Sequence, residues 1–312
     1  MSFCVKELLK KYGDKVVVDH LNFEMKNPGV YALLGTNGAG KSTSLRIMLG
    51  MLASDSGEVL WNNKPFDAVK MNVGYLAEER GLYPKYSLLD QLLYFAKLKG
   101  VSKKDAMKRI QYWSARLKVE EYVFPPTKKG KKAVKANRAD QLSKGNQQKI
   151  QLMAALLSEP QFLILDEPLS GLDPVNTDLF KEIIREEIAK EKYLIMSSHQ
   201  MPTIEEFCSD ITILNRGKTV LSGNLNEIKK SYGRVNLFVN SDIEIASYIS
   251  SFGLKIAAKT PEVYHLKVSG EQQAMQFLKK LVEDQVPVVR FELREPSLHE
   301  IFIEKVGTTN EG

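Results

Sequence analysis

Over the first 225 or so residues, short apolar runs alternate with amphipathic stretches. Three apolar runs indicate buried strands: VYALLG (30–35), FLILD (162–166) and YLIMSS (193–198). KSTSLRIMLGML (41–52) directly follows the first strand and indicates a helix. A further helix begins at Pro174, because proline fits the first turn of a helix. ITILNRGKTVLSG (211–223) predicts a hairpin that turns at Arg216-Gly217. This alternation is typical of an α/β domain.

Capping signals predict a helical insert within this domain. SLLD (87–90) and SKKD (102–105) each place an acid three residues after a serine that can begin a helix. We expect these helices to end near Lys99 and Lys118. A third helix follows LSKGNQQ (142–148), because apolar residues recur there at helical spacing. The insert would span about residues 85–158.

The pattern changes after about residue 229 and predicts a second domain. The expected order is a strand at 235–240, a helix at 243–252, strands at 254–258 and 263–268, a helix at 271–283 and a strand at 286–293. This β-α-β-β-α-β order predicts a small α+β domain of the ferredoxin-like type. A last helix would follow, with Ser297 and Glu300 as its capping box. We therefore divide the chain into domains at 1–228 and 229–312.

The composition is that of a folded chain without a membrane span of its own. The 312 residues are 43% hydrophobic and 26% charged, and no apolar run approaches the ~18 residues that a spanning helix needs. The N-terminus lacks the apolar core of a secretory signal. Two cysteines give no disulfide framework, and no Cys/His cluster suggests zinc. We expect a cytosolic chain.

The segment GTNGAGKST (35–43) carries the first chemical signal. It fits the pattern G-x-x-x-x-G-K-[ST] and lies between a strand and a helix, the context that this phosphate-binding loop requires. Its glycines let the backbone wrap a phosphate, Lys41 offers a cation to the β- and γ-phosphates, and Ser42 offers a hydroxyl to Mg²⁺. A chance glycine loop in front of a helix is the alternative.

FLILDEP (162–168) ends an apolar strand with two carboxylates. Asp166 at the carboxyl end of the strand can hold Mg²⁺ through water. Glu167 would project toward the γ-phosphate and polarise the attacking water. A solvated acidic loop is the alternative when the pair is considered alone.

LSKGNQQ (142–148) is a helix start with a serine hydroxyl and bare backbone N–H groups, which favours an anion. The chain already has a phosphate loop about a hundred residues earlier, so a second anion site needs an explanation. An ordinary capped helix is the alternative.

Together these segments resemble the ATP-binding cassette (ABC) ATPases. GTNGAGKST, LSKGNQQ, LILDEP, SGLDP (170–174) and His199 after YLIMSS stand in the order of that family, over about residues 3–225. YLAEERGLYP (75–84) and the tail EPSLHEIFIEKVG (295–307) resemble its sodium-extrusion and drug-export branch, which has an extra C-terminal domain. The resemblance implies a P-loop ABC ATPase fold, with a mixed sheet core, an antiparallel β subdomain and a helical insert.

The resemblance also assigns the LSKGN segment to a nucleotide held by another chain. In this family two chains pair head to tail, and each γ-phosphate is held between one phosphate loop and the partner's signature segment. The residues implied across the interface are Ser143, Gly145, Asn146 and Asp173. Asn146 stands where many relatives have glycine.

The remaining site residues are carried over by position. His199 resembles the histidine that contacts the γ-phosphate, which makes it catalytic beside Glu167, and Tyr12 resembles the aromatic residue that stacks on adenine. The nucleotide-binding set is Tyr12, Gly35, Asn37, Gly38, Ala39, Gly40, Lys41, Ser42 and Thr43. The metal set is Ser42, Glu78 and Asp166, and the implied cofactors are ATP and Mg²⁺.

Two departures from the family pattern stand out. Glu78 occupies a position where most relatives have glutamine that reaches Mg²⁺ and the attacking water. It would also lie beside the groove for the membrane partner's cytosolic helix, where Arg80, Tyr83, Lys85 and Tyr86 offer contacts. The second departure is PPTKKGKKAVKANRADQ (125–141), whose basic run at 128–138 is a solvated loop, or contacts anionic lipid or an acidic partner loop.

The function implied is the ATP-hydrolysing motor of a membrane exporter, peripheral on the cytoplasmic face and coupled to a separate transmembrane subunit. A homodimer is preferred over pairing with a different cassette. The alternatives are a cassette protein acting on nucleic acid or ribosomes, and a P-loop kinase or transferase. The first commonly carries two cassettes, and the second has no use for LSKGN or SGLDP, so we expect no nucleic-acid partner.

Overall fold

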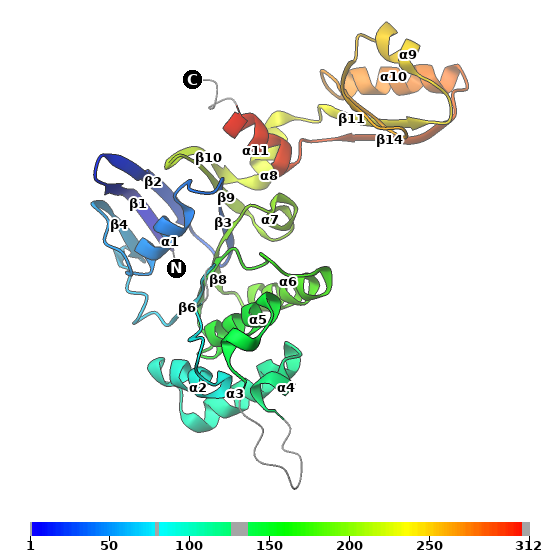
Figure 1. Cartoon of the computed structure of the whole chain (residues 1–312). Coiled ribbons are helices and arrows are strands. Elements are labelled where there is room, and N and C mark those ends of the chain that lie inside the picture. Colours follow the sequence, from blue (N-terminus) through cyan, green and yellow to red (C-terminus); the bar gives the residue numbers. More distant parts are fainter. Residues whose placement is uncertain (1, 79–80, 126–136, 308–312) are drawn as a thin grey trace. The chain divides into compact units, whose positions relative to one another are not determined.

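The structure is a computed structural model, which describes residues 2–78, 81–125 and 137–307 (Figure 1). The chain forms two compact units, Met1–Ser222 and Gly223–Gly312. This division lies before the limit of 228 that the sequence predicts. The reason is α8 (Leu225–Tyr232), a helix that the sequence analysis did not anticipate. Its Tyr232 hydroxyl donates to Oε1 of Glu304 in α11 (Leu298–Gly307) at 3.1 Å, so α8 belongs with the second unit.

The centre of the first unit is a parallel sheet whose strands are buried on both faces, as their apolar sequences predict. Its order is β9-β3-β8-β7-β6, for strands β3 (Gly29–Gly35), β6 (Val73–Leu76), β7 (Phe162–Asp166), β8 (Tyr193–Ser198) and β9 (Asp210–Asn215). Because these strands run parallel, Gly35, Asp166 and Ser198 end at one edge of the sheet. Loops that follow this edge therefore share one site.

An antiparallel part extends the same ten-stranded sheet. Its strands are β1 (Phe3–Tyr12), β2 (Lys15–Met25), β4 (Ser56–Trp61) and β5 (Lys64–Pro65), and β10 (Lys218–Asn224) joins it to β9. Aromatic contacts join the two parts, since the rings of Phe3 and Phe162 lie 4.9 Å apart and those of Phe23 and Tyr31 stack at 4.3 Å. The mixed sheet and antiparallel subdomain implied by the resemblance are therefore present.

The longer helices of the first unit also follow the predictions, whereas the short helices at 120–123, 139–141 and 201–207 were not predicted. The insert contains α2 (Leu88–Leu98), α3 (Lys103–Arg116), α4 (Glu120–Val123), the 3₁₀ helix η1 (Ala139–Gln141) and α5 (Lys144–Leu156). Ser87 and Ser102 each accept from the backbone N–H three residues later, so both are N-caps as predicted. The acid at the third position accepts from the serine hydroxyl and not from the backbone N–H of the serine, so the capping boxes are only half formed. Outside the insert lie α1 (Lys41–Met48), α6 (Pro174–Ala189) and α7 (Met201–Phe207). Helix α1 ends before the predicted residue 52, because Gly50 adopts a φ of 70°.

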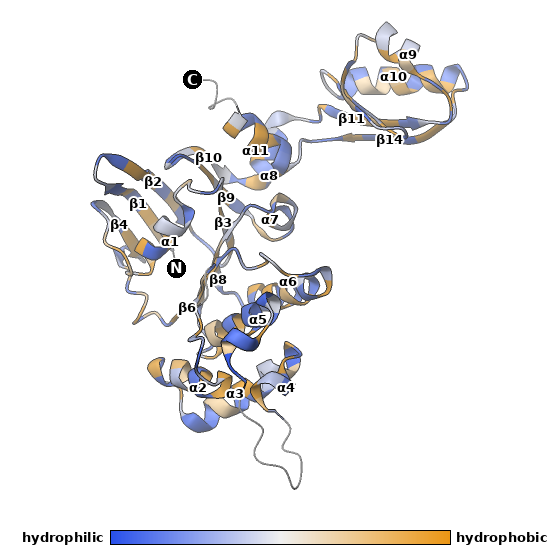
Figure 2. Cartoon of the chain, in the orientation of Figure 1, coloured by the Kyte–Doolittle hydropathy of each residue, from blue (hydrophilic) through white to orange (hydrophobic). Residues whose placement is uncertain are grey.

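The second unit has the predicted β-α-β-β-α-β order. Its elements are β11 (Asn236–Ser241), α9 (Ala246–Ser251), β12 (Lys255–Lys259), β13 (Tyr264–Lys267), α10 (Glu271–Glu283) and β14 (Val288–Arg294), with the sheet order β12-β13-β11-β14. Leu237 and Val239 face a core that includes Phe277 and Leu281 of α10. Figure 2 shows α10 with both hydrophobic and hydrophilic residues, as expected for a helix with one buried side.

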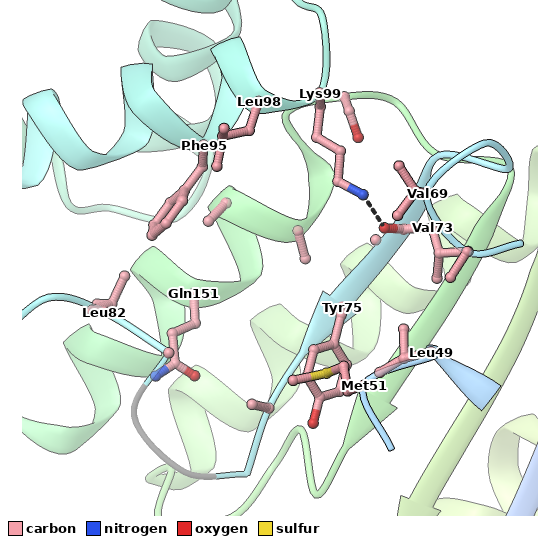
Figure 3. A pocket seen from close by; sticks show the side chains of 17 residues that line it. Leu49, Met51, Val69, Val73, Tyr75, Leu82, Phe95, Leu98, Lys99 and Gln151 are labelled. Atoms are coloured by element: carbon pink, nitrogen blue, oxygen red, sulfur yellow. Dashed lines mark hydrogen bonds between the residues drawn. The ribbon is translucent and has the colours of Figure 1, made fainter. Parts of the chain in front are cut away.

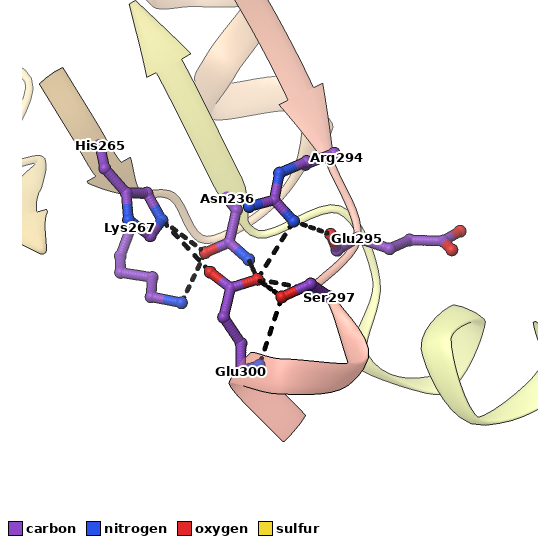
Figure 4. A network of polar contacts seen from close by, with 7 residues as sticks. All are labelled: Asn236, His265, Lys267, Arg294, Glu295, Ser297 and Glu300. Carbon is purple, nitrogen blue, oxygen red and sulfur yellow. Dashed lines mark hydrogen bonds and ion pairs between the residues drawn. The ribbon is translucent and has the colours of Figure 1, made fainter. Parts of the chain in front are cut away.

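A polar network joins α11 to the sheet of the second unit (Figure 4). Glu300 Oε2 accepts from Ser297 N at 2.6 Å and from Arg294 Nη1 at 3.1 Å, and Ser297 Oγ accepts from Glu300 N at 3.2 Å. The predicted capping box is therefore present. Lys267 Nζ and His265 Nε2 both lie within hydrogen-bonding distance of Oδ1 of Asn236. These contacts fix the start of α11 against strands β11, β13 and β14.

Within the described ranges, no helix is both long enough and apolar enough to cross a membrane.

Candidate functional site

The segment 35–43 forms a loop between β3 and α1, as its pattern predicts. Gly40 is the N-cap of α1, with φ 105° and no side-chain cap, so backbone N–H groups of the first turn are left for a ligand. A Cβ at Gly40 would lie 2.4 Å from the carbonyl oxygen of Val17, so no larger residue fits there. Ala39 O accepts from Gly217 N at 3.1 Å. The loop is thus held from behind by β2 and by the β9–β10 turn.

The side chains of this loop divide into buried and accessible groups. Ala39, Gly40 and Lys41 are buried, Ser42 and Thr43 are half-buried, and Thr36, Asn37 and Gly38 are exposed. Lys41 Nζ donates to the carbonyls of Gly35 at 2.8 Å and Thr36 at 3.2 Å. The ammonium therefore lies inside the curve of the loop, where a phosphate bound to the helix start would meet it.

Asp166 and Glu167 follow β7 at the same edge of the sheet. Both are almost fully buried, and Glu167 Oε1 lies 3.9 Å from Lys41 Nζ. Glu167 has a φ of 49°, an uncommon conformation for a residue with a side chain. Its backbone N–H donates to Ser197 Oγ at 3.0 Å, and the Ser197 hydroxyl donates to Asp166 Oδ1. The Ser197 hydroxyl thus contacts the carboxylate of Asp166 and the backbone of Glu167.

His199 extends this group from the end of β8. Its Nδ1 lies 2.8 Å from Glu167 Oε2, while its ring is largely exposed. The predicted catalytic pair is therefore in contact, and the buried cation of Lys41 lies on the other oxygen of the same carboxylate. A carboxylate placed between a lysine and a histidine can accept a proton from water.

Ser143 is the N-cap of α5 and accepts from the backbone N–H of Asn146 at 3.2 Å. Ser143 is exposed, and Gly145 and Asn146 are half-buried. A Cβ at Gly145 would lie 3.7 Å from Leu172, so this helix start packs beside the SGLDP segment. The positive end of a thirteen-residue helix is therefore accessible from outside the chain.

Asp173 is the N-cap of α6 and accepts from Asn176 N at 2.9 Å. This backbone hydrogen bond is the main reason that the pKa of Asp173 lies below its usual range. Burial lowers the pKa of neighbouring Lys149, and the charge of Asp173 opposes that effect. The structure thus gives Asp173 a capping role within its own chain, and contact with a second phosphate loop stays a prediction.

Tyr12 ends β1 and is about half exposed at 53%. It pairs with Lys15, two residues before the Val17 carbonyl that lies against Gly40. The hairpin end that carries this ring is therefore a short distance along β2 from the phosphate loop. Lys10 Nζ lies 5.6 Å from the centroid of this ring, and the exposed part of the ring can stack on a planar group.

Glu78 lies just past the carboxyl end of β6 and lines a pocket with Gln147, Gln148 and Ser170. It is exposed to solvent. Arg80 and residues 126–136 of the predicted basic loop lie outside the described residues. Tyr83, Lys85 and Tyr86 are exposed.

The sequence analysis missed two side chains. Ser197 was counted as part of a strand, although a pair of serines ending an otherwise apolar buried strand is a signal for a polar role. Gln151 was counted as a position on a helix. With its amide turned to satisfy both atoms, Gln151 donates to Ala77 O at 3.2 Å and accepts from Gly81 N at 2.9 Å. It is a buried amide on α5 that holds the segment carrying Glu78.

The residues at the edge of the sheet where β3 and β7 end fit a magnesium ion as well as a nucleotide. Ser42 offers a hydroxyl and Asp166 a buried carboxylate that one hydroxyl already orients. Mg²⁺ prefers such oxygen ligands and commonly binds through one or two carboxylates together with phosphates.

Two family models match this chain. Residues 18–170 match the ABC transporter model, and residues 223–306 match the C-terminal domain of the DrrA1-3-like ATP-binding proteins. The second match falls within the second compact unit.

The chain is also similar to curated proteins over nearly its full length. It is 39% identical to an uncharacterized ABC transporter ATP-binding protein, YhaQ, of Bacillus subtilis, over 98% of this chain and 99% of that protein. It is 30% identical to the bacitracin transport ATP-binding protein BcrA of Bacillus licheniformis, over 98% of each. Among solved structures, an ATP-binding subunit of an ABC transporter matches with a TM-score of 0.65 and 26% identity, over 74% of this chain and 93% of that chain.

Proposed function

This chain belongs to the family of ABC transporter ATP-binding proteins, and on that premise we propose that it is the motor subunit of a membrane exporter. It would bind MgATP between two copies and hydrolyse it to drive a separate transmembrane subunit. The observation that carries the proposal is the contact of Glu167 with both Lys41 and His199 beside the phosphate loop.

ATP hydrolysis would be carried out by the residues at the edge of the sheet where β3, β7 and β8 end. The N–H groups of the first turn of α1 and the ammonium of Lys41 bind the phosphates and offset their charge. Glu167 accepts a proton from the attacking water, since its Oε2 already meets an imidazole and its burial excludes bulk solvent. His199 orients the carboxylate and contacts the γ-phosphate. Tyr12 stacks on adenine.

The proposed metal is Mg²⁺, and it would offset charge that develops on the transferred phosphoryl group. Ser42 and Asp166 would hold it, and Glu78 would contribute a carboxylate where most relatives have an amide. Ser197 keeps Asp166 in place through its hydroxyl, so the ligand orientation does not depend on the metal.

The proposed ATP-bound state is a head-to-tail homodimer. Ser143, Gly145 and Asn146 present the accessible positive end of α5, and within one chain the first turn of α1 supplies a separate phosphate site. The γ-phosphate of an ATP bound to the partner copy is an anion of the right size for this helix start. Asp173 would face the partner's phosphate loop from the adjoining helix.

The proposed docking site for the membrane subunit is a groove in the first unit (Figure 3). It encloses about 460 Å³ between α2, α5 and β6, and it is lined by apolar residues such as Tyr75, Leu82 and Phe95. Its rim carries Met51, Val69 and Leu98, which are 65%, 82% and 65% exposed. Exposed apolar side chains around a groove mark a surface for a partner.

An aromatic cluster adjoins the groove. Tyr83 contacts the rings of Tyr86 and Tyr94 at 5.7 Å and 6.5 Å, and all three rings are about half exposed or more. Tyrosine offers both an apolar ring and a hydroxyl, which suits a helix that lies at the edge of a membrane. The chain would therefore sit on the cytoplasmic face, where the basic run 128–138 could contact anionic lipid.

The proposal is tested by purifying the tagged chain with the membranes of its own host in mild detergent. An integral membrane protein should co-purify and should increase ATP hydrolysis by the chain. Leu98→Glu should lose both effects while it still binds ATP. Val282→Glu is the matched control, since Val282 is 63% exposed on α10 of the other unit. Retention of the partner by Leu98→Glu would refute the docking site. Absence of any such partner from the wild-type purification would refute the motor role.

A further inference from the structure

Gln151 lies between the two pockets of the first unit that matter for function. It lines the apolar groove together with Leu82 and Phe95, and it also lines the pocket formed by Glu78, Gln147 and Ser170. Figure 3 shows its side chain leaving α5 toward the segment that follows β6. The side chain is 6% exposed, so its amide needs partners within the protein.

Both amide atoms find those partners on the backbone of one short segment. In the amide orientation that gives both of its polar atoms a partner, the nitrogen donates to Ala77 O at 3.2 Å, and the oxygen accepts from Gly81 N at 2.9 Å. These two groups lie on either side of Glu78, one residue before it and three residues after it. A single side chain of α5 therefore contacts the backbone of Ala77 and of Gly81. The distance between Ala77 and Gly81 is fixed as long as both hydrogen bonds hold.

The same helix begins at Ser143, which caps its first turn. A helix of thirteen residues moves as a stiff rod, because each turn is hydrogen-bonded to the next. Any displacement of the Ser143 end therefore carries Gln151 with it. Gln151 holds the backbone on both sides of Glu78, so that displacement also shifts the Glu78 carboxylate. Glu78 follows β6, the strand next to the one that ends at Asp166.

We infer that Gln151 is a positioning residue that ties Glu78 to the helix carrying the LSKGN segment. The inference rests on the metal-directed role proposed for Glu78. It adds that α5 sets the position of Glu78, so that the site where the partner's nucleotide binds and the site where the chain's own Mg²⁺ binds are mechanically linked. Glutamine serves here because its amide carries a donor nitrogen and an acceptor oxygen, and the side chain is long enough to reach both backbone groups.

The test is a double-mutant cycle on the full chain, with Mg²⁺ titrated at saturating ATP. The quantity compared is the Mg²⁺ requirement, which is the Mg²⁺ concentration that gives half of the maximal rate of ATP hydrolysis. Gln151→Met keeps the length and volume of the side chain but removes both hydrogen bonds. We expect a Mg²⁺ requirement raised by about 5-fold or more, the lower limit that follows from the loss of two hydrogen bonds of ordinary strength. The KM for ATP should change little, and any fall in the melting temperature should be matched by that of Gln91→Met, which also removes two hydrogen bonds of a buried glutamine. In a Glu78→Ala background the same substitution should have no further effect on the Mg²⁺ requirement.

Gln91 offers a matched control. It is also a buried glutamine that clamps a backbone segment, accepting from Tyr83 N at 3.1 Å and donating to Tyr86 O at 3.3 Å. Gln91→Met should leave the Mg²⁺ requirement the same, both in the wild-type background and in the Glu78→Ala background. If Gln151→Met does not fold, Gln151→Asn retains the amide but is too short to reach both backbone groups, and it should raise the Mg²⁺ requirement in the same way.

The outcomes separate the inference from its premise. If Glu78→Ala raises the Mg²⁺ requirement and Gln151→Met does not, Gln151 does not position Glu78 and the inference is wrong. If the two substitutions raise it additively, Gln151 acts by another route and the inference is also wrong. If Glu78→Ala leaves the Mg²⁺ requirement unchanged, the metal-directed role of Glu78 is refuted, and the inference falls with it.

Discussion

Nδ1 of His199 lies 2.8 Å from Oε2 of Glu167, and the other oxygen of that carboxylate lies 3.9 Å from Nζ of Lys41. The carboxylate is buried and the histidine ring is largely exposed. One carboxylate thus connects the phosphate-binding loop with an exposed imidazole that follows β8. This relationship suggests separate tests of the base, its orienting residue and the composite site.

Glu167→Gln should abolish hydrolysis without abolishing binding. The amide keeps the shape of the side chain but cannot accept a proton, so turnover should fall by roughly 10²-fold or more. ATP should still bind, and the variant should accumulate as an ATP-bound dimer in size-exclusion chromatography. Lys41→Ala should instead weaken nucleotide binding itself. A Glu167→Gln variant that turns over ATP at near the wild-type rate would show that another group is the base.

His199→Ala should slow turnover by acting through Glu167. We expect a loss of about 10- to 100-fold, since an orienting residue contributes less than the base it serves. In the Glu167→Gln background, His199→Ala should cause little further loss, because residues that act as a unit are not additive. Single-turnover rates of the four proteins measure this coupling. Independent, multiplying losses would contradict the contact as a functional unit.

The sequence was sufficient to locate the central strands, most of the longer helices and the local motifs of the candidate site, but not the antiparallel strands β1, β2, β4 and β5 or the helix α8. The phosphate loop, the carboxylate pair, His199 and the helix N-caps at Ser87, Ser102 and Ser297 are local patterns. The three serines cap their helices as expected, and His199 contacts Glu167. Each is defined by neighbouring residues along the chain, so a pattern can reveal it.

The contacts that escaped prediction join distant segments. Ser197 and Asp166 are 31 residues apart, and their pairing depends on the register of β7 with β8. Gln151 reaches back past the insert to Ala77 and Gly81. Neither residue stands out in sequence, because a serine in a strand and a glutamine on a helix are common. Only the packing of the parallel sheet and of α5 shows which backbone groups they meet.

Glu300 should make the second unit sensitive to acid. Burial favours its neutral form, but the hydrogen bonds from Ser297 and the charges of Arg294 and Lys267 outweigh it and hold the pKa below the ordinary 4.5. A carboxyl whose pKa is lower in the folded state stabilises that state above the unfolded pKa, and the stabilisation is lost as pH falls through the folded pKa. The unit should therefore lose stability as the pH falls below 4.5.

Glu300→Gln tests this contribution by urea unfolding at several pH values. The variant should be less stable at pH 7 by about 1–3 kcal/mol, the range for hydrogen bonds to a charged group, and its stability should depend less on pH in the acid range. Glu295→Gln is the matched control, because the Glu295 side chain points away from the network in Figure 4. Equal acid sensitivity of the wild type and Glu300→Gln would contradict the role of this carboxylate.

A chain that ends at Asn224 should fold and bind ATP. It retains every strand of the ten-stranded sheet. Both α8 and α11 are absent from it, so neither helix is left without the other. We expect a cooperative melting transition that ATP raises, as binding to the folded state requires. A soluble fragment without ATP binding, or one without a melting transition, would mean that the two units fold as one.

The central claim is that each ATP is held between the phosphate loop of one chain and the LSKGN segment of another. Ser143→Arg places a bulky side chain at the helix start, and should prevent dimerisation and turnover while monomers still bind ATP. Lys41→Ala should be inactive because it lacks the lysine that meets the phosphates. Mixing the two inactive chains tests the claim most directly, because a mixed dimer contains one site with an intact Lys41 and an intact Ser143. The account predicts that the mixture hydrolyses ATP although neither chain does so alone. If the mixture stays inactive while the two chains form mixed dimers, the LSKGN segment serves its own chain's nucleotide and the claim is wrong.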